Sequence, residues 1–124
     1  KMEIESPNDK LMNRIMKVIN GNLSNPNLTV EMIANEVGTS RVHLNRKLKE
    51  LTNQTAREFI KNCRLKQAAE LLSQKKQNIT EIAELTGFNN PNNFSTAFKE
   101  LFGVSPSAYK EYLDTKKENE ETQS

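Results

Sequence analysis

The sequence has little of what disulfide-stabilised, membrane-spanning or β-rich proteins require. Its only cysteine is Cys63, which excludes an internal disulfide and fits a reducing compartment. No apolar run approaches the ~20 residues of a membrane span, and no charged segment followed by an apolar one indicates a signal peptide. Tryptophan is absent, and glycine and proline number four each. So few helix breakers favour an all-α soluble protein, which we expect in the cytoplasm.

The sequence also lacks the motifs that carry catalysis. It has no glycine-rich phosphate loop, nucleophile elbow or paired set of carboxylates. Its single histidine, His43, and its single cysteine give no cluster of metal ligands. We therefore predict no enzyme activity, no metal and no cofactor. The 124 residues suit one compact domain or two small helical subdomains, and because the chain begins at Lys1 we expect a piece of a longer protein.

Positive charge is concentrated in one part of the chain. Residues 40–66 carry eight Lys or Arg and two Glu, a net charge of +6, whereas the whole chain carries +2. These cations are Arg41, Arg46, Lys47, Lys49, Arg57, Lys61, Arg64 and Lys66. Residues 67–110 are neutral, and residues 111–124 carry −3. A basic block in a nearly neutral domain indicates either a polyanion-binding surface or a solvated helix face.

Apolar residues recur at helical spacing in seven segments that turn signals separate. Capping boxes begin the first, fourth and fifth helices, at Ser6, Thr55 and Asn78. Gly38, Asn53 and Gly103 suit helix ends. We expect helices over about residues 7–19, 29–37, 41–51, 55–73, 79–85, 92–102 and 106–113. Residues 1–5 are predicted to be the end of a linker, and residues 114–124 a disordered acidic tail.

The chain repeats itself with an offset of 49 to 50 residues. Ile33-Ala34 and Gly38 match Ile82-Ala83 and Gly87. The stretch LNRKLKEL (residues 44–51) matches FSTAFKEL (residues 94–101), and Phe59 matches Tyr109. The second turn is one residue longer than the first. In each copy a short helix with a small residue and a terminal glycine precedes a second helix, which is the order of a helix-turn-helix motif.

The second helix of each motif has a face free to enter a DNA groove. At 100° per residue, Leu44, Leu48 and Leu51 point inward in the first copy, and Phe94, Phe98 and Leu101 do so in the second. The outward sets are then Val42, Asn45, Arg46 and Lys49, and Asn92, Ser95, Thr96 and Lys99. Arg can recognise guanine, Asn adenine, and Val a thymine methyl group. Two equivalent helices favour DNA binding over a plain solvated surface, and a protein–protein interaction module is the alternative.

Over about residues 10–113, the sequence resembles the AraC/XylS family of bacterial transcription regulators. The most specific stretch is ITEIAELTGFNNPNNFSTAFKELFGVSPSAY, residues 79–109. It has the Ile-Ala pair, the Gly-Phe, the Phe-x-x-x-Phe-Lys core and the Gly-x-Ser-Pro-x-x-Tyr of the family. Residues 28–72 match as well, including Arg64-Leu65 and Ala68. TNQTA (residues 52–56) departs from the usual Gly-x-Ser-Pro, and we expect a different cap with the same fold.

The resemblance implies two recognition helices in major-groove segments on one face of double-stranded DNA. Carried onto this chain, the base-facing positions are Val42, Asn45, Arg46, Asn92, Asn93 and Thr96. We expect phosphate contacts from Ser40, Arg41, Lys49, Arg57, Lys61, Ser95 and Lys99. The sequence is also similar to C-terminal output domains of hybrid two-component sensors. That similarity implies an upstream sensor or receiver region in the full-length chain, with RNA polymerase as a candidate partner.

These observations predict two unequal subdomains, residues 6–54 and 74–113, joined by a connecting helix over residues 55–73. About 19 helical residues span ~28 Å, somewhat less than the ~34 Å between successive major-groove faces. We therefore expect slight DNA bending or binding dominated by one subdomain. The basic block places most phosphate contacts on the first subdomain and the connecting helix. Arg64 has two interpretations, as a phosphate contact or as a brace of the two subdomains that pairs with an acid. Cys63 is predicted to be a small buried hydrophobe.

Overall fold

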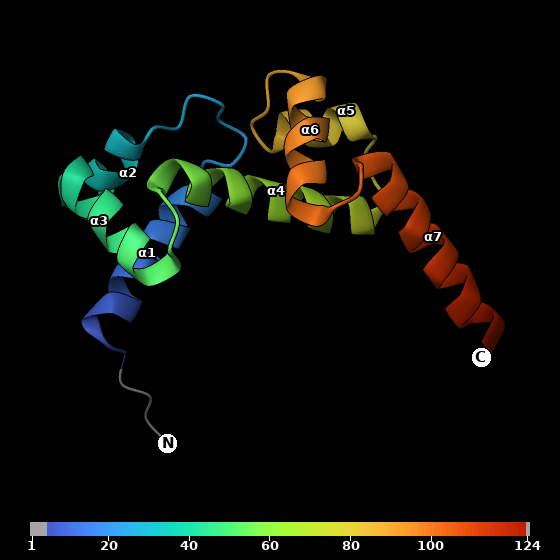
Figure 1. Cartoon of the computed structure of the whole chain (residues 1–124), viewed down its shortest axis with the longest axis horizontal. Helices are drawn as coiled ribbons and strands as arrows, with labels where there is room; N and C mark the ends of the chain where they lie inside the picture. Colours follow the sequence, from blue (N-terminus) through green and yellow to red (C-terminus); the bar gives the residue numbers. More distant parts are fainter. Residues whose placement is uncertain (1–4, 124) are drawn as a thin grey trace. The chain divides into compact units, whose positions relative to one another are not determined.

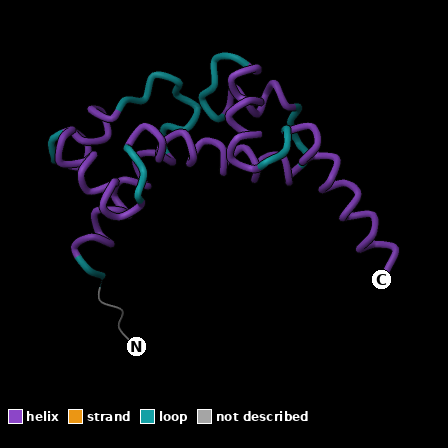
Figure 2. Tube along the Cα trace, viewed as in Figure 1, coloured by secondary structure: helices purple, strands orange, loops and turns teal. Residues whose placement is uncertain are grey.

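The computed structural model describes the backbone of residues 5–123 and the side chains of residues 5–116. This part of the chain has seven helices and no strand, which confirms the predicted all-α class (Figures 1 and 2). The helices are α1 (Pro7–Asn20), α2 (Val30–Val37), α3 (Arg41–Thr52), α4 (Ala56–Gln74), α5 (Ile79–Leu85), α6 (Pro91–Phe102) and α7 (Pro106–Gln123). Residues 1–4 of the predicted linker lie outside the described residues.

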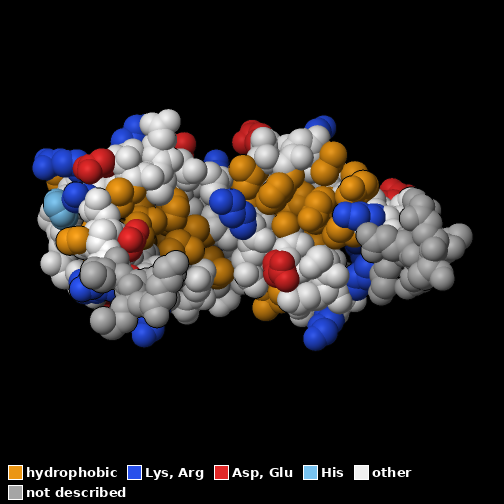
Figure 3. Space-filling view, turned by 90° about the horizontal axis from the view of Figure 1, so that it is seen from below, with side chains coloured by type: hydrophobic (Ala, Val, Ile, Leu, Met, Phe, Trp, Pro, Cys, Tyr) orange, Lys and Arg blue, Asp and Glu red, His pale blue; other side chains and the backbone are white. Residues whose placement is uncertain are grey.

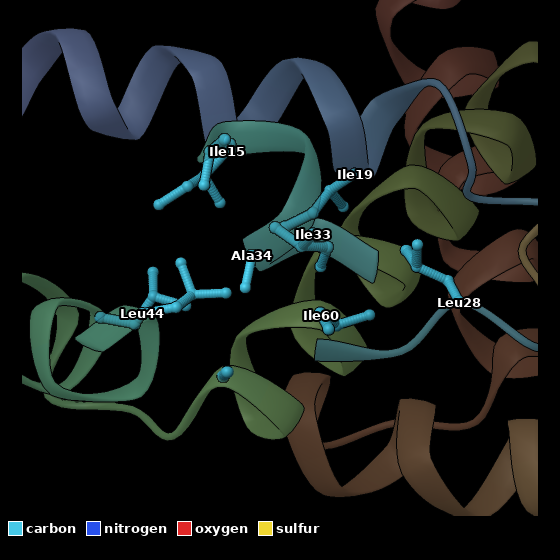
Figure 4. Close-up of a cluster of buried hydrophobic side chains, with 10 residues drawn as sticks. Ile15, Ile19, Leu28, Ile33, Ala34, Leu44 and Ile60 are labelled. Carbon is cyan, nitrogen blue, oxygen red and sulfur yellow. The ribbon is translucent and has the colours of Figure 1, made fainter. Parts of the chain in front are cut away.

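The chain forms two compact units, Lys1–Cys63 and Arg64–Ser124, so the division falls inside α4. The first unit buries apolar side chains from α1, the loop before α2, α2, α3 and the start of α4 around one core (Figure 4). Fully buried members include Ile15, Ile33, Leu44 and Leu48, each 0% exposed. In Figure 4 Ile15, Ile33 and Leu44 come from three different helices. Burial of apolar surface is therefore what holds the first helix-turn-helix motif to α1.

The second unit repeats this construction with aromatic side chains. Its buried core combines residues of α4, α5 and α6: Leu65, Ala68, Leu72, Ile82, Ala83, Phe94 and Phe98. The rings of Phe94, Phe98, Phe102 and Tyr109 follow one another with centroids 4.5 to 6.2 Å apart. Tyr109, in the first turns of α7, packs against this core. The start of α7 therefore completes the core of the second unit, as the start of α4 completes that of the first.

The predicted helix caps are present. Ser6 and Asp9 exchange the two hydrogen bonds of a capping box at α1, and Asn78 and Glu81 do the same at α5. Thr55 and Glu58 form the equivalent pair before α4, with Glu58 N–H donating to Thr55 Oγ1 at 3.1 Å. These side chains satisfy amide groups that the first turn of a helix leaves free. The departure at residues 52–56 thus changes the cap and keeps the fold.

Two expectations differ from the structure. Leu51 and Leu101, predicted to point inward, are 36% and 38% exposed, because helical periodicity gives a face but not how far neighbouring helices cover it. The second difference is α7, which continues to Gln123 through most of the segment predicted to be disordered. Residues 107–123 contain no proline or glycine and are rich in Lys and Glu, which suits a helix. The predicted tail residue Ser124 lies outside the described residues.

The surface of each unit is mixed. On the face drawn in Figure 3, hydrophobic side chains gather in places and Lys and Arg side chains are scattered among them. This face therefore carries no continuous basic area among the residues coloured there. Within the described part of the chain, no helix is both long and apolar enough to cross a lipid bilayer.

Gly38, which ends α2, has φ of +75°, and a Cβ built on it meets nothing within 4 Å. A side chain at this position therefore finds room but requires the left-handed backbone that L residues disfavour. We expect Gly38→Ala to lower the free energy of unfolding by about 1–2 kcal/mol through backbone strain alone. Urea unfolding would measure the loss. The opposite change, Asn53→Gly at φ of +59°, should raise stability, and an unchanged midpoint for both variants would contradict this explanation.

Candidate nucleic-acid interface

The turns that connect α2 to α3 and α5 to α6 use the same hydrogen bonds. Gly38 N–H donates to Asn35 O at 3.2 Å, and Thr39 N–H donates to Ala34 O at 2.9 Å. The second turn has the equivalent bonds, from Gly87 N–H to Glu84 O at 3.1 Å and from Phe88 N–H to Ala83 O at 2.9 Å. The repeat seen in the sequence is therefore a repeat of turn geometry, with a glycine at positive φ in both copies.

The helices that follow these turns, α3 and α6, bury and expose the same positions one for one. Leu44 and Leu48 on α3 and Phe94 and Phe98 on α6 are each 0% exposed. The first turns and the outer faces are exposed at equivalent positions, which are Arg41, Val42, His43, Arg46 and Lys49 on α3, and Pro91, Asn92, Asn93, Thr96 and Lys99 on α6. Each unit thus presents one helix whose outer face carries polar and cationic side chains.

Five of the six predicted base-contacting residues are exposed on these faces: Val42, Arg46, Asn92, Asn93 and Thr96. Val42 is 66% exposed, unusual for a large apolar side chain. Asn45, the sixth, is half-buried, and its Oδ1 accepts a hydrogen bond from Ala56 N–H at 3.2 Å, at the start of α4. Because an asparagine recognises adenine with both its oxygen and its nitrogen, the Ala56 amide competes with a base for Oδ1 of Asn45.

Several of the predicted phosphate contacts have intramolecular partners. Ser40 caps α3, with its Oγ accepting from His43 N–H at 3.1 Å. Arg41 lies 3.5 Å from Glu31 of α2, and both side chains are more than half exposed, so this ion pair is weak and open to exchange. Lys49 Nζ donates to Asn53 O at 3.3 Å at the end of its own helix. Of these side chains only Arg41 is paired with an acid among the described residues.

Other predicted phosphate contacts are cations without such partners. Arg57 and Lys61 on α4 and Lys99 on α6 are exposed, and none has an ion pair or hydrogen bond to the side-chain-described residues 5–116. The same holds for Arg46 of α3. A cation without an internal partner keeps its full charge for a polyanion. Ser95 is half-buried at the position equivalent to Asn45.

His43 is a candidate that the sequence analysis considered only as a metal ligand. It is exposed in the first turn of α3, at the position equivalent to Asn93 of α6. The sequence repeat could have identified His43 as a candidate, because it aligns His43 with the predicted base contact Asn93.

Arg64 donates a hydrogen bond to a backbone oxygen. Its Nη1 donates to the backbone oxygen of Thr86 at 3.0 Å, at the turn between α5 and α6. The side chain is 7% exposed, and burial lowers the pKa of the guanidinium below its usual value. Arg64 therefore braces α4 against the turn of its own unit, and its burial argues against a phosphate contact. Cys63, predicted to be buried, is half-buried against the first core.

Comparisons with known proteins agree with this geometry. Residues 33–112 match the family described as "Helix-turn-helix domain". The chain is 39% identical over 106 residues to histidine kinase P4 of Formosa agariphila, covering 86% of this chain and 8% of that protein. The chain thus spans a small part of the length of that relative.

Solved structures with the same fold include regulator domains. The C-terminal domain of AraT, a response regulator from Geobacillus stearothermophilus, has 34% identity and a TM-score of 0.77, covering 86% of this chain and 88% of that chain. A transcriptional regulator of Chromobacterium violaceum, described as containing an AraC-type DNA-binding domain, has 25% identity and a TM-score of 0.79, covering 84% and 92%. The chain belongs to the helix-turn-helix family of AraC-type transcription regulator domains.

Proposed function

We propose that the chain binds double-stranded DNA sequence-specifically, with α3 and α6 as recognition helices in the major groove. The observation that carries the proposal is the shared burial of the two helices, which leaves equivalent faces exposed after equivalent turns. An α-helix fits the major groove of B-DNA, where each base pair presents a distinct set of donors and acceptors. Membership in a family of transcription regulator domains supports the same function.

The chemistry of the two faces is different. Arg46 offers the two donors that recognise guanine, and Val42 offers an apolar contact for a thymine methyl group. The second face has Asn92 and Asn93, whose backbone amides both donate to Asn90 Oδ1, at 2.7 and 3.3 Å. This cap fixes the first turn of α6. We therefore propose that α3 combines charge with guanine recognition, whereas α6 recognises bases through uncharged side chains.

Selection of binding sites from a random duplex library tests the proposal. The expected result is a motif of two short conserved blocks, one for each recognition helix, that the chain binds more tightly than a scrambled duplex. A library that shows no enrichment, with equal affinity for every duplex, would contradict sequence-specific recognition and leave only electrostatic binding.

We further propose that the chain is the output domain of a longer, signal-responsive cytoplasmic regulator and has no enzyme activity of its own. The support is the small fraction of histidine kinase P4 that it spans and its likeness to a response-regulator domain. Its partners would then be an upstream sensor or receiver region and RNA polymerase. Titration of a promoter duplex with the full-length protein, with and without phosphodonor, tests this, and identical affinities would contradict it.

Asn92→Ala and Asn93→Ala should each change the base preference in the block recognised by α6 and leave the other block unchanged. Each change removes one side chain able to pair with adenine, and a good bidentate contact discriminates by about 1–3 kcal/mol. Repeating the selection with each variant measures the effect. Asn35→Ala, the same chemical change on the exposed surface of α2, is the control. A selected motif that stays the same in both variants would remove these residues from the recognition surface.

A further inference from the structure

Arg14 and Arg64 are equivalent residues that make equivalent hydrogen bonds. Arg14 of α1 donates from Nη2 to the backbone oxygen of Val37 at 2.9 Å, and Arg64 of α4 donates from Nη1 to that of Thr86 at 3.0 Å. The acceptors are 49 positions apart, which is the offset of the repeat before the turn, and the donors are 50 apart, which differs from it by one residue. The repeat therefore extends to the first helix of each unit, which sequence comparison of the two motifs had not included.

The accepting carbonyl is the same in both units, because it belongs to the residue just before the turn glycine. The turn amides already use the carbonyls of Ala34 and Asn35 in the first unit, and those of Ala83 and Glu84 in the second. A helix C-terminus carries partial negative charge, so a guanidinium there makes a charge-assisted hydrogen bond. Each arginine thus fixes the point at which its chain leaves one helix and turns toward the recognition helix.

We propose that Arg14 and Arg64 are positioning residues, each holding the turn of its unit so that the recognition helix meets DNA at a fixed angle. This inference rests on the proposed DNA-binding function. Apolar packing holds α3 and α6 in place but is not directional, whereas a hydrogen bond to a backbone oxygen is. Only three residues, Gly38 to Ser40, separate the Val37 carbonyl from α3. A shift at that carbonyl therefore moves the first turn of α3, which carries Val42 and His43.

Arg14→Met is the sharpest test, because Arg14 is exposed and its replacement disturbs the packing of the core less than replacement of the buried Arg64. The readout is discrimination, the ratio of Kd for a duplex with one changed base to Kd for the selected duplex. We expect discrimination to fall by about tenfold at positions recognised by α3, the equivalent of one hydrogen bond to a charged group. Discrimination at positions recognised by α6 should stay unchanged. Arg14→Lys keeps a cationic donor and should restore part of the loss.

Lys17→Met is the matched control. Lys17 lies on α1 with Arg14, and both line a groove of about 700 Å³ between α1 and α2. Its ammonium has no hydrogen-bond or ion-pair partner among the side chains that the structure describes. The variant loses the same charge and gains the same side chain without touching the Val37 carbonyl. We expect its affinity to change equally on all duplexes, with discrimination preserved.

Arg64→Met gives the crossed result, a loss of discrimination at the positions of α6 and not at those of α3. Because Arg64 is buried, its variant is first checked for folding by circular dichroism. If Arg64→Met unfolds, the comparison of Arg14→Met with Lys17→Met tests the positioning role alone. An Arg14→Met chain with a lower Tm but full discrimination would overturn the inference and leave a purely structural brace. A wild-type chain that shows no discrimination would instead overturn the proposed function, so the two failures are distinguishable.

Discussion

Phe98→Ala should lower the free energy of unfolding by about 3–5 kcal/mol, the range for truncating a fully buried aromatic side chain. Phe98 is 0% exposed and its ring contacts three others, those of Phe94, Phe102 and Tyr109, at centroid distances of 5.8, 4.5 and 5.6 Å. Alanine removes these contacts and leaves a cavity between α6 and α7. Urea unfolding followed by far-UV circular dichroism measures the loss.

The same helix supplies the control. Leu101→Ala truncates a side chain that is 38% exposed, so less burial is lost and the destabilisation should be clearly smaller. In the first unit Leu48, at the position equivalent to Phe98, is also 0% exposed, and Leu48→Ala should cost about 2–5 kcal/mol. If Phe98→Ala were no more destabilising than Leu101→Ala, the aromatic cluster would not be the core of the second unit.

Arg46→Ala should weaken binding to the selected duplex by about 1–3 kcal/mol and relax specificity at one position of the α3 block, as expected for a lost contact to guanine. Arg46 is exposed in the second turn of α3 and has no partner among the described side chains. Removing it therefore costs the fold little. Anisotropy titrations against duplexes with each base at that position measure both effects.

Arg57→Ala is the matched comparison for Arg46→Ala. Arg57 is also exposed and without an internal partner, but it lies on α4 rather than on a recognition helix. We expect it to weaken binding equally on all sequences and to make the salt dependence shallower by about one phosphate contact. Arg46→Ala behaving in the same uniform way would make Arg46 a phosphate contact and refute its role in base recognition.

Apart from the end of α7, helix limits and caps could be predicted because they depend on chemistry within a few residues. Ser6, Thr55 and Asn78 cap the helices as their local sequences indicate, and Gly38 and Gly103 take the left-handed backbone at helix ends. The exposed faces of α3 and α6 followed from periodicity for the same reason. These features need no knowledge of which distant residues meet.

The contacts that could not be predicted join residues far apart in the sequence. Asn45 was expected to face DNA, yet its Oδ1 is held by the first amide of α4, eleven positions away. Arg64 was expected either to contact phosphate or to brace by pairing with an acid, and its hydrogen bond to the Thr86 backbone oxygen is one that no side-chain pattern reveals. Arg14 drew no attention, because neither its charge nor its spacing marks it. Its role becomes visible only when its hydrogen bond to Val37 O is compared with that of Arg64 to Thr86 O.

Fluorescence anisotropy of the wild-type chain against a selected and a scrambled duplex, over a range of salt concentrations, tests DNA recognition by α3 and α6 most directly. We predict tight binding to the selected duplex, weaker binding to the scrambled one, and log Kd that rises linearly with log salt, by about 0.9 for each phosphate contact. Weak binding that is the same for both duplexes and independent of salt would contradict DNA recognition, and would favour a protein–protein interaction module.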